Sequence, residues 1–576
     1  MIKAVFNNPF SVSSWKTELI SPKLILTADK INDVIPLINS AEIEAKNGNH
    51  VALLVSYEAA PAFDSAFICK REHCFPPAIA MISSDSLPLN INTNEKELDI
   101  NLDWHPLISR NEYNFSIKKI KDYISSGDTY QVNFTFPLQT KFNLNPIDYF
   151  HNLCFAQRAN YSCFINLENF TVISLSPELF FRRDGNKLTV KPMKGTMKRG
   201  RFNLEDEYLA AELKMSKKNR AENLMIVDML RNDLGKISKI SSVNTKSLFD
   251  IEKYNTVFQM TSTVESEINP SVSIADIFKA LFPCGSVTGA PKIRTMEIIN
   301  EVEKYPRGIY TGAIGLIKPG GDCVFNVPIR TIAIDKKCRL ATFNVGGGIV
   351  SDSTVEDEFN ECLTKSFFIS ENAPFFQLLE SLLLDDGEIF LFDEHIKRIK
   401  SSAKYFDYIF DENKFKRTLI DISKQFPTGK FKIRVLNDIF GNIETEVAKI
   451  SDLPLPRKIT FAASPVNSSD KFLYHKTTNR KVYTNAKADF TEYDDVILWN
   501  EKDEITETTI CNIVVQLNGE KITPTISSGL LNGVYRQKLL SEGKIKEGIL
   551  RREDLYKAEK IYLINSVRKW LSAIIK

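Results

Sequence analysis

The 576-residue sequence lacks several features that would narrow its function at once. Its nine cysteines include no Cys-x-x-Cys pair, which argues against both a disulfide framework and a structural zinc site. No apolar run approaches the roughly 18 residues that a membrane span needs, and the N-terminus MIKAVFNNPF has no basic-then-apolar signal pattern. We therefore expect no membrane association and a cytoplasmic location.

An excess of charge of one sign is also missing. The formal net charge is only +2, with 74 Lys and Arg against 72 Asp and Glu. A nucleic-acid or membrane-surface binder is expected to carry a strong basic patch, so this balance argues against both and favours small-molecule chemistry. Hydrophobic residues at 43% and charged residues at 25% match an ordinary globular composition.

The length predicts two or three folded bodies. From about residue 20 to 190, β-rich runs such as VALLVSYEA, TYQVNFTFPL and TVISLSPELFF alternate with polar helical stretches, which predicts a mixed α/β core built on a large sheet. Residues 203–235 carry apolar side chains at helical spacing. This spacing predicts long helices that pack on that core and end at Gly235.

The periodicity breaks at residues 370–374, in the sequence SENAP. Beyond it, runs such as FKIRVL, DDVILW and KIYLIN are separated by polar turns, which again predicts a mixed α/β body. We therefore expect two domains, residues 1–370 and residues 374–576.

Five segments of the first half concentrate reactive or glycine-rich residues, although each alone is compatible with a strand end, a turn or a solvated helix. The segments are SPE at 176–178, PMKGT at 192–196, AENLMIVD at 221–228, FPCGSVTGAPK at 282–292 and GGGIV at 346–350. Together, over roughly residues 50–370, they resemble the chorismate-utilising enzymes. The resemblance implies a large two-sheet α/β (α+β) fold.

The resemblance also implies a site for a dicarboxylate and for Mg²⁺, which prefers hard oxygen ligands. Glu222 and Glu361, on different predicted helices, match the positions that hold the metal. Cations and amide groups suit the carboxylates of the substrate. The positions that match the substrate-binding residues are Thr288, Gly289, Tyr310, Arg330, Gly347 and Lys365.

Two positions distinguish the branches of this family. The isochorismate and salicylate branch uses a lysine base where this sequence has Gln131, and an amide cannot take a proton from water. The anthranilate synthase large subunit usually has alanine where this sequence has Lys194. A neutral lysine can add to the chorismate ring and then be displaced by ammonia, which leaves the amino group para to the carboxylate. Lys194 therefore favours the aminodeoxychorismate synthase branch.

Glu178 matches the proton donor to the departing hydroxyl, because Gln259, which stands where relatives often have histidine, cannot protonate it. The sequence contains no cysteine in a glycine-rich elbow of the amidotransferase type. Ammonia is therefore expected to come from solution or from a separate glutamine amidotransferase subunit.

Four motifs of the second half resemble the class IV aminotransferase-fold enzymes, a D-amino-acid aminotransferase-like α/β domain. They are DEHIKR at 393–398, YHKTTNR at 474–480, EITETTICNI at 504–513 and LLNGVYR at 530–536. This resemblance implies pyridoxal 5′-phosphate, with Lys476 as its Schiff-base lysine and Glu507 at the pyridine nitrogen. The remaining matched positions face the phosphate: Arg398, Val534, Tyr535 and Ser566.

The two resemblances predict a bifunctional enzyme of 4-aminobenzoate, a folate precursor. The first half aminates chorismate to 4-amino-4-deoxychorismate, and the second eliminates pyruvate from it. Three alternatives stay open: an anthranilate synthase component in the first half, a class IV amino-acid aminotransferase in the second, and a C-terminal scaffold without catalysis. A homodimer through the C-terminal domain is also compatible with the sequence.

Overall fold

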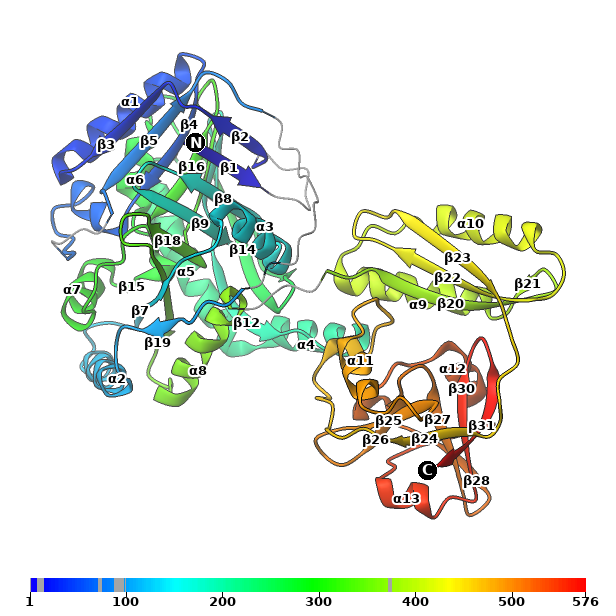
Figure 1. Cartoon of the computed structure of the whole chain (residues 1–576). Coiled ribbons are helices and arrows are strands. Elements are labelled where there is room, and N and C mark those ends of the chain that lie inside the picture. The colour runs from blue at the N-terminus through cyan, green and yellow to red at the C-terminus, as the bar shows by residue number, and fades with distance from the viewer. Residues whose placement is uncertain (1, 8–14, 71–74, 88–97, 99, 371–374) are drawn as a thin grey trace. The chain divides into compact units, whose positions relative to one another are not determined.

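Contacts between residues divide the chain into two compact units (Figure 1). Unit 1 comprises Met1–Lys198 and Ala210–Ala373, and unit 2 comprises Arg199–Leu209 and Pro374–Lys576. The structure, a computed structural model, describes every residue except 1, 8–14, 71–74, 88–97, 99 and 371–374. Most of the predicted break at 370–374 therefore lies outside the described residues.

Unit 1 contains two large sheets. The nine-stranded sheet runs in the order β15 (Gly289–Ala290), β7 (Gln131–Lys141), β19 (Leu340–Ile349), β18 (Thr331–Asp335), β9 (Phe170–Ser176), β8 (Tyr161–Asn166), β1 (Lys3–Asn7) and β2 (Thr17–Ile20), with β6 (His105–Pro106) paired to β7. The ten-stranded sheet runs in the order β12 (Met193–Lys198), β14 (Val257–Glu267), β11 (Lys187–Lys191), β10 (Leu179–Asp184), β17 (Cys323–Asn326), β16 (Ala313–Ile317), β4 (His50–Val55), β5 (Ala78–Ser83) and β3 (Leu24–Ala28), with β13 (Asn244–Lys253) paired to β14.

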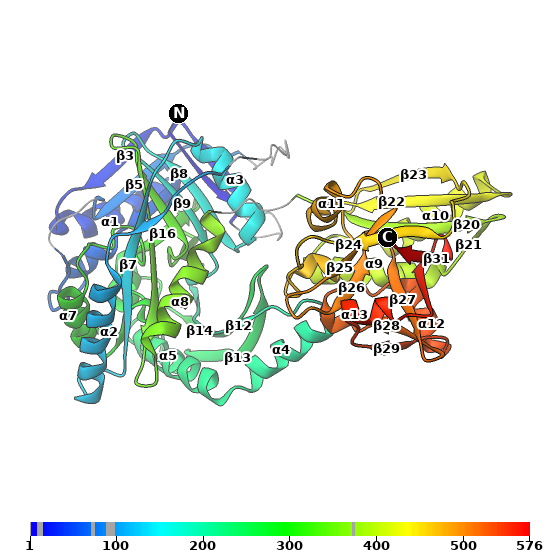
Figure 2. The same ribbon diagram turned by 60° about the horizontal axis from the view of Figure 1, so that its bottom comes forward.

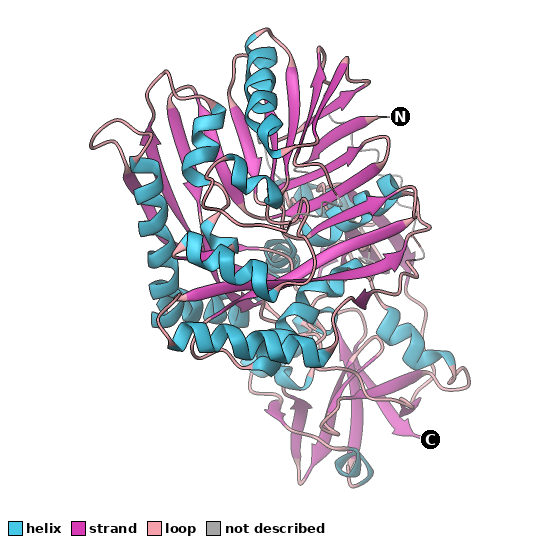
Figure 3. Ribbon diagram, turned by 90° about the vertical axis from the view of Figure 1, so that its left-hand side faces the viewer, coloured by secondary structure: helices cyan, strands magenta, loops and turns pink. Residues whose placement is uncertain are grey.

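The two sheets of unit 1 pack face to face, and helices cover their outer faces (Figure 3). Strand β4 illustrates the arrangement, because successive side chains of a strand point to opposite faces. Leu54 belongs to a core cluster that joins both sheets, whereas Leu53 packs with the helices on the outer face. All five apolar residues from Val51 to Val55 are therefore buried, which explains why VALLV is a continuous apolar run.

The helices of unit 1 are short to medium in length. They are η1 (Ile31–Asp33), α1 (Val34–Lys46), η2 (Tyr57–Ala62), α2 (Arg110–Ser125), α3 (Pro146–Gln157), α5 (Lys217–Gly235), α6 (Ile274–Leu281), η3 (Gly285–Val287), α7 (Lys292–Val302), α8 (Val355–Ser366) and η4 (Phe367–Ile369). Helices α5 and α8 matter most for the site. Each is capped by a hydroxyl, since Ser216 Oγ accepts from Asn219 N and Thr354 Oγ1 accepts from Asp357 N.

The helical stretch expected at residues 203–235 is two helices, α4 (Asn203–Met215) and α5, and α5 does end at Gly235. Residues Arg199–Leu209, which include the first half of α4, are part of unit 2, so the expectation that this whole stretch packs on the first core was wrong. Helical spacing identifies an apolar face but not the surface that the face covers.

Unit 2 contains two smaller sheets. The four-stranded sheet has the order β21 (Glu388–Ile389), β20 (Leu378–Asp385), β22 (Lys430–Asn437) and β23 (Ile443–Lys449). The eight-stranded sheet has the order β26 (Ile505–Thr508), β25 (Asp495–Trp499), β24 (Arg457–Phe461), β31 (Lys569–Ile575), β30 (Lys560–Asn565), β27 (Asn512–Leu517), β28 (Glu520–Pro524) and β29 (Lys546–Gly548).

Unit 2 also contains helices, which lie beside its two sheets (Figure 2). They are α9 (Phe392–Phe406), α10 (Glu412–Gln425), η5 (Lys471–Leu473), α11 (Lys481–Ala488), η6 (Ile526–Ser528), α12 (Val534–Ser541) and α13 (Arg552–Tyr556). Both units are thus mixed α/β, which confirms the predicted fold class. No helix among the described residues is long and apolar enough to span a membrane.

Candidate active sites

A cavity of about 400 Å³ in unit 1 collects residues that are far apart in the sequence. Its walls come from the β9–β10 connection, β12, β19, α5 and α8. Of the predicted residues, those that line it are Glu178, Lys194, Glu222, Tyr310, Arg330, Gly347, Glu361 and Lys365. Thr288 and Gly289 follow the lining residue Val287, but they are not among the described residues that line the cavity.

Lys194 enters the cavity from an irregular part of β12. Between Met193 and Thr196 the pairing with β14 shifts register, and Gly195 has a φ of 103° that favours glycine. The Lys194 ammonium lies 3.7 Å from Glu222 Oε2 on α5. Burial lowers the pKa of Lys194, although Glu222 opposes the shift, and the lowered pKa favours the neutral amine.

Glu178 is almost fully buried, with 3% of its surface exposed. Its Oε1 accepts a hydrogen bond from Ser286 Oγ at 2.7 Å. Burial raises its pKa to about 7, so a substantial fraction of this carboxyl is protonated near neutral pH. A protonated carboxyl beside an amine of lowered pKa is an acid and nucleophile pair.

The three glycines of β19 lie where neighbouring atoms leave no space for a side chain. A Cβ at Gly348 would lie 2.8 Å from Lys194 Nζ and 2.9 Å from Gln131 Nε2, so a larger residue would push both side chains away. Gln131 is fully buried, and neither polar atom of its side chain has a hydrogen-bond partner within the described chain. The shape of the cavity wall here thus depends on glycine.

Cations and carboxylates alternate around the rest of this cavity. Lys365 Nζ lies 2.7 Å from Glu361 Oε1 and donates to the carbonyl oxygen of Gly346 at 3.0 Å. Burial acts to raise the pKa of Glu361, but Lys365 outweighs it and the pKa is lowered. Arg330 donates to Gln157 Oε1 at 2.8 Å. Apart from Glu222 and Glu361, Glu358 also lines the cavity, a carboxylate that the motif comparison missed.

Proteins usually bind Mg²⁺ through one or two carboxylates, and water and substrate oxygens supply the remaining ligands. The donor chemistry of Glu222 and Glu361 therefore fits the ion. Among the described residues, no group of three or more His, Cys, Asp or Glu side chains is arranged to hold a metal by itself. A metal at this site would depend on the substrate for further oxygen ligands.

A second cavity, of about 530 Å³, lies in unit 2. Every position predicted to contact the cofactor lines it. These residues are Arg398, Lys476, Glu507, Val534, Tyr535 and Ser566.

Lys476 and Glu507 provide the chemistry that pyridoxal phosphate needs. Burial, followed by the Arg398 cation, lowers the pKa of Lys476 to about 8, which favours the neutral amine. Glu507 accepts from Tyr483 Oη at 2.8 Å, from Asn512 Nδ2 at 3.1 Å and from the amide of Leu531 at 3.1 Å. Burial raises its pKa to about 7. The buried carboxyl is thus fixed in position to meet a pyridine nitrogen.

The predicted phosphate contacts differ in how available they are. Helix α12 begins at Val534, and its first amides line the cavity beside Ser566. A Cβ at Gly533 would lie 2.1 Å from Asn512 Oδ1, so glycine is required before this helix. Arg398 uses Nε and Nη2 on the two oxygens of Glu380, at 2.8 and 2.6 Å. Its position fits an anion site, but two of its donors are already engaged.

Comparisons with known proteins agree with the two units. Residues 76–371, just over half of the chain, match the chorismate binding enzyme family, and residues 377–574 match amino-transferase class IV. Aminodeoxychorismate synthase component 1 of Bacillus subtilis is 40% identical over 252 residues, which cover 44% of this chain and 53% of that protein. Anthranilate synthase component 1 3 of Haloarcula marismortui is 41% identical over 251 residues, with 43% and 49% covered.

The chain thus spans about half the length of these curated relatives. The crystal structure of anthranilate synthase component I from Streptococcus pneumoniae superposes with a TM-score of 0.56 at 22% identity, covering 63% of this chain and 93% of that one, and this likeness shows the fold. The chain therefore belongs to the chorismate binding enzyme family, and it carries an amino-transferase class IV domain after the chorismate-binding one.

Proposed function

We propose that the protein makes 4-aminobenzoate in two steps, by amination of chorismate in unit 1 and elimination of pyruvate in unit 2. The observation that carries the proposal is Lys194, a buried amine of lowered pKa that shares a cavity with the protonatable Glu178. This pair supports covalent amination. The name of the relative from Bacillus subtilis supports the same reaction.

In the first step, neutral Lys194 adds to the ring carbon distal to the leaving hydroxyl, the double bond shifts and the C–O bond breaks. Glu178 gives its proton to the departing oxygen, which leaves as water, and then takes up the extra proton of the new C–N nitrogen. Ammonia then adds by the reverse shift and displaces the lysine. Glu178 gives its proton to the departing lysine nitrogen and takes one from the newly bound ammonium, which regenerates both the neutral amine of Lys194 and the acid form of Glu178. Glu222 and Glu361 would hold Mg²⁺ against one substrate carboxylate.

The remaining substrate contacts are assigned to cations and amides of the same cavity. Arg330, Lys365 and Tyr310 would bind the carboxylates, together with the Gly347 backbone. Thr288 and Gly289 would act through the backbone that shapes the wall, because Thr288 O accepts from the amide of Asn133, which lines the cavity.

In unit 2, pyridoxal phosphate supplies an electron sink for the carbanion formed when a proton leaves the substrate. Lys476 would hold the cofactor and move that proton, and Glu507 would keep the pyridine nitrogen protonated. Arg398, Ser566 and the amides of Val534 and Tyr535 would bind the phosphate.

The charge of the second cavity supports a substrate with several negative charges. Its basic lining residues outnumber its acidic ones, Asp494, Asp495 and Glu507. A dicarboxylate together with a phosphate matches this excess, which favours 4-amino-4-deoxychorismate over a monocarboxylate amino acid. The basic residues are Arg398, Lys432, Arg434, Lys449, Arg457, Lys476, Arg480, Arg536 and Arg568.

A second candidate for unit 1 is ortho-amination, because a relative of similar identity is an anthranilate synthase component. Incubation of the protein with chorismate, Mg²⁺, ammonium and pyridoxal phosphate should yield 4-aminobenzoate, and anthranilate as the product would contradict the proposal. Lys194→Ala and Lys476→Ala are the controls that assign each step to its unit.

The proposal also includes the setting of the reaction. Ammonia would be delivered by a separate glutamine amidotransferase, two copies of the chain would pair through unit 2, and the enzyme would work in the cytoplasm. Activity with glutamine only after a purified amidotransferase is added would test the first point, and sedimentation would test the second.

A further inference from the structure

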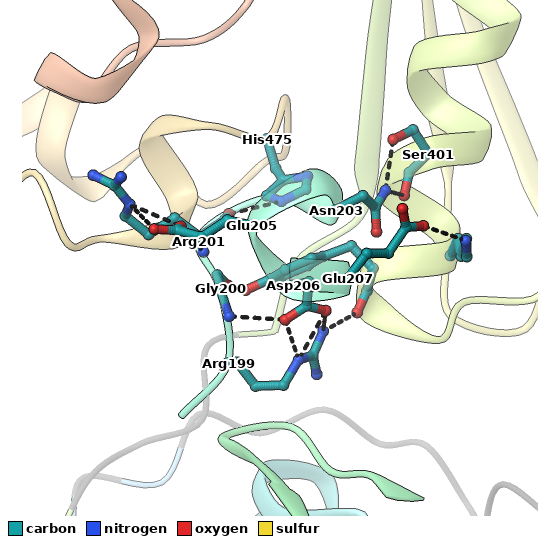
Figure 4. A network of polar contacts seen from close by, with 11 residues as sticks. Arg199, Gly200, Arg201, Asn203, Glu205, Asp206, Glu207, Ser401 and His475 are labelled. Atoms are coloured by element: carbon teal, nitrogen blue, oxygen red, sulfur yellow. Dashed lines mark hydrogen bonds and ion pairs between the residues drawn. The ribbon is translucent and has the colours of Figure 1, made fainter. Parts of the chain in front are cut away.

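Residues Arg199–Leu209 separate the two catalytic elements of unit 1, β12 with Lys194 and α5 with Glu222, yet they fold as part of unit 2. We call them the docked segment. Four residues separate Lys194 from its first residue, Arg199. Figure 4 shows the polar contacts that the docked segment makes.

The docked segment holds its own shape through a buried ion pair. Arg199 Nη2 lies 2.6 Å from Asp206 Oδ2, and both side chains are less than one tenth exposed. Asp206 Oδ1 also accepts from the amide of Gly200 at 2.8 Å. A Cβ at Gly200 would lie 2.3 Å from the amide nitrogen of Asp206, so this close turn requires glycine.

One side of the docked segment contacts the loop that carries Lys476. His475 Nε2 lies 3.2 Å from the carbonyl oxygen of Arg201, and His475 Nδ1 lies 3.0 Å from Ser402 Oγ. Burial lowers the pKa of His475 to about 3, so the ring is neutral. Because a carbonyl only accepts, Nε2 carries the proton and Nδ1 accepts from Ser402. Arg201 Nη1 also donates to Tyr474 Oη at 2.8 Å.

Another part of the docked segment contacts α9, the helix that carries Arg398. Asn203 Nδ2 donates to the carbonyl oxygen and the hydroxyl of Ser401, at 2.7 and 2.6 Å (Figure 4). Tyr405 Oη donates to the carbonyl oxygen of Gly200 at 2.6 Å. The docked segment therefore bridges α9, which carries the cavity residue Arg398, and the loop before the cavity residue Lys476.

On its other side, the Lys476 loop is tied to β20. The carbonyl oxygen of Lys476 accepts from the amide of Leu379 at 3.0 Å, and the amide of Thr478 donates to the carbonyl oxygen of Gln377 at 2.9 Å. Contacts on both sides thus fix the backbone on either side of Lys476. A loop held at two sides keeps its side chain in one orientation, which a catalytic lysine needs.

We propose that the docked segment positions Lys476 for its cofactor, with Arg201 and His475 as positioning residues. This inference rests on the proposed function, which assigns pyridoxal phosphate to Lys476. It means that a segment that stands in the sequence between two catalytic elements of the chorismate-binding unit supports the Lys476 loop of the other unit.

The full-length variant Arg201→Met tests the inference, because it keeps most of the apolar stem and removes the guanidinium. That group donates to Tyr474 Oη, to the carbonyl oxygens of Ser468 and Ser527, and to the Glu205 carboxylate. We expect the Kd for pyridoxal phosphate, measured by absorbance titration, to rise about tenfold, as for a lost buried hydrogen bond. The pH midpoint of the bound cofactor's absorbance should shift as well. The matched control is Glu207→Gln, which breaks only the exposed pair with Lys404 on the same segment and should leave both values unchanged.

Equal Kd values and midpoints in Arg201→Met and Glu207→Gln would overturn the positioning role. A second pair covers a variant that fails to fold: His475→Gln keeps a donor near the Nε2 position, whereas His475→Leu has none. Gln should restore the cofactor spectrum and Leu should not, and equal spectra would again overturn the inference. Failure of the unmodified protein to bind pyridoxal phosphate would instead contradict the proposed function.

Discussion

The two cavity lysines, Lys194 and Lys476, are both largely shielded from solvent, but their main charged neighbours have opposite signs. Burial lowers both pKa values, but around Lys194 the next largest influence is the Glu222 carboxylate, which raises the pKa. Around Lys476 it is the Arg398 cation, which lowers the pKa further, to about 8. The surroundings of Lys476 thus favour its neutral amine without a metal. At Lys194, a cation bound by the Glu222 carboxylate would lower the pKa of the lysine further.

The largest effect that would test this comparison is expected from Lys476→Ala. Without the lysine, unit 2 has no group to hold the cofactor or to move the substrate proton, so formation of 4-aminobenzoate should fall by about 10³-fold or more. Amination in unit 1 should continue, and 4-amino-4-deoxychorismate should accumulate in a chromatographic assay. Loss of chorismate consumption in the same variant would show that the two steps are not separable as we propose.

Lys194→Ala should have the next largest effect. We expect amination at low ammonia to fall on the order of 10³-fold, because the covalent route is lost and ammonia must attack directly. High ammonia should restore part of the rate. Binding of chorismate with Mg²⁺ should persist, since Glu222 and Glu361 are unchanged. Turnover equal to that of the unmodified protein at low ammonia would exclude Lys194 as the nucleophile.

Glu178→Gln is expected to slow amination by about 10²-fold, within the usual range for a general acid. The pKa of Glu178 is raised to about 7, so its acid form decreases as the pH rises through that value. The rate of the unmodified protein should therefore fall above about pH 7. In Glu178→Gln this fall should disappear, because the amide does not titrate, and a fall that persists would assign the titration to another group.

Local sequence patterns predicted several elements of the fold, and motif matches named residues that lie far apart in the chain. The buried apolar run at β4 and the glycine at the end of α5 follow from local patterns, and motif matches placed Glu178, Lys194, Glu222 and Glu361 in one cavity. Spacing alone did not bring these four together, because they come from distant parts of the chain.

The parts that were not predicted depend on tertiary contacts. The docked segment has ordinary helical spacing, and tertiary contacts such as those of Asn203 and Arg201 reveal that it belongs to unit 2. The pairing of Arg398 with Glu380 was also missed, since the partner lies 18 residues away on β20. Tyr483 on α11, which donates to Glu507, had no motif of its own.

The smallest predicted effect bears most directly on the two lysines. If Mg²⁺ binds Glu222 and Glu361, it neutralises carboxylates that now raise the pKa of Lys194, so chelation of the metal should raise that pKa. Because the neutral amine is the reactive form, the rising limb of the amination rate should then move to higher pH. This limb should be followed at saturating chorismate, over a series of low Mg²⁺ concentrations, so that substrate binding is not limiting.

The matched measurement on unit 2 is the pH midpoint of the cofactor's absorbance in the same samples. Cations already surround Lys476, and none of the carboxylates assigned to Mg²⁺ lines its cavity, so this midpoint should not move. An equal displacement of both titrations would mean that the metal acts on the whole protein rather than on the carboxylates beside Lys194. A rising limb that stays fixed while Mg²⁺ is removed would show that Lys194 does not depend on the metal for its neutral form.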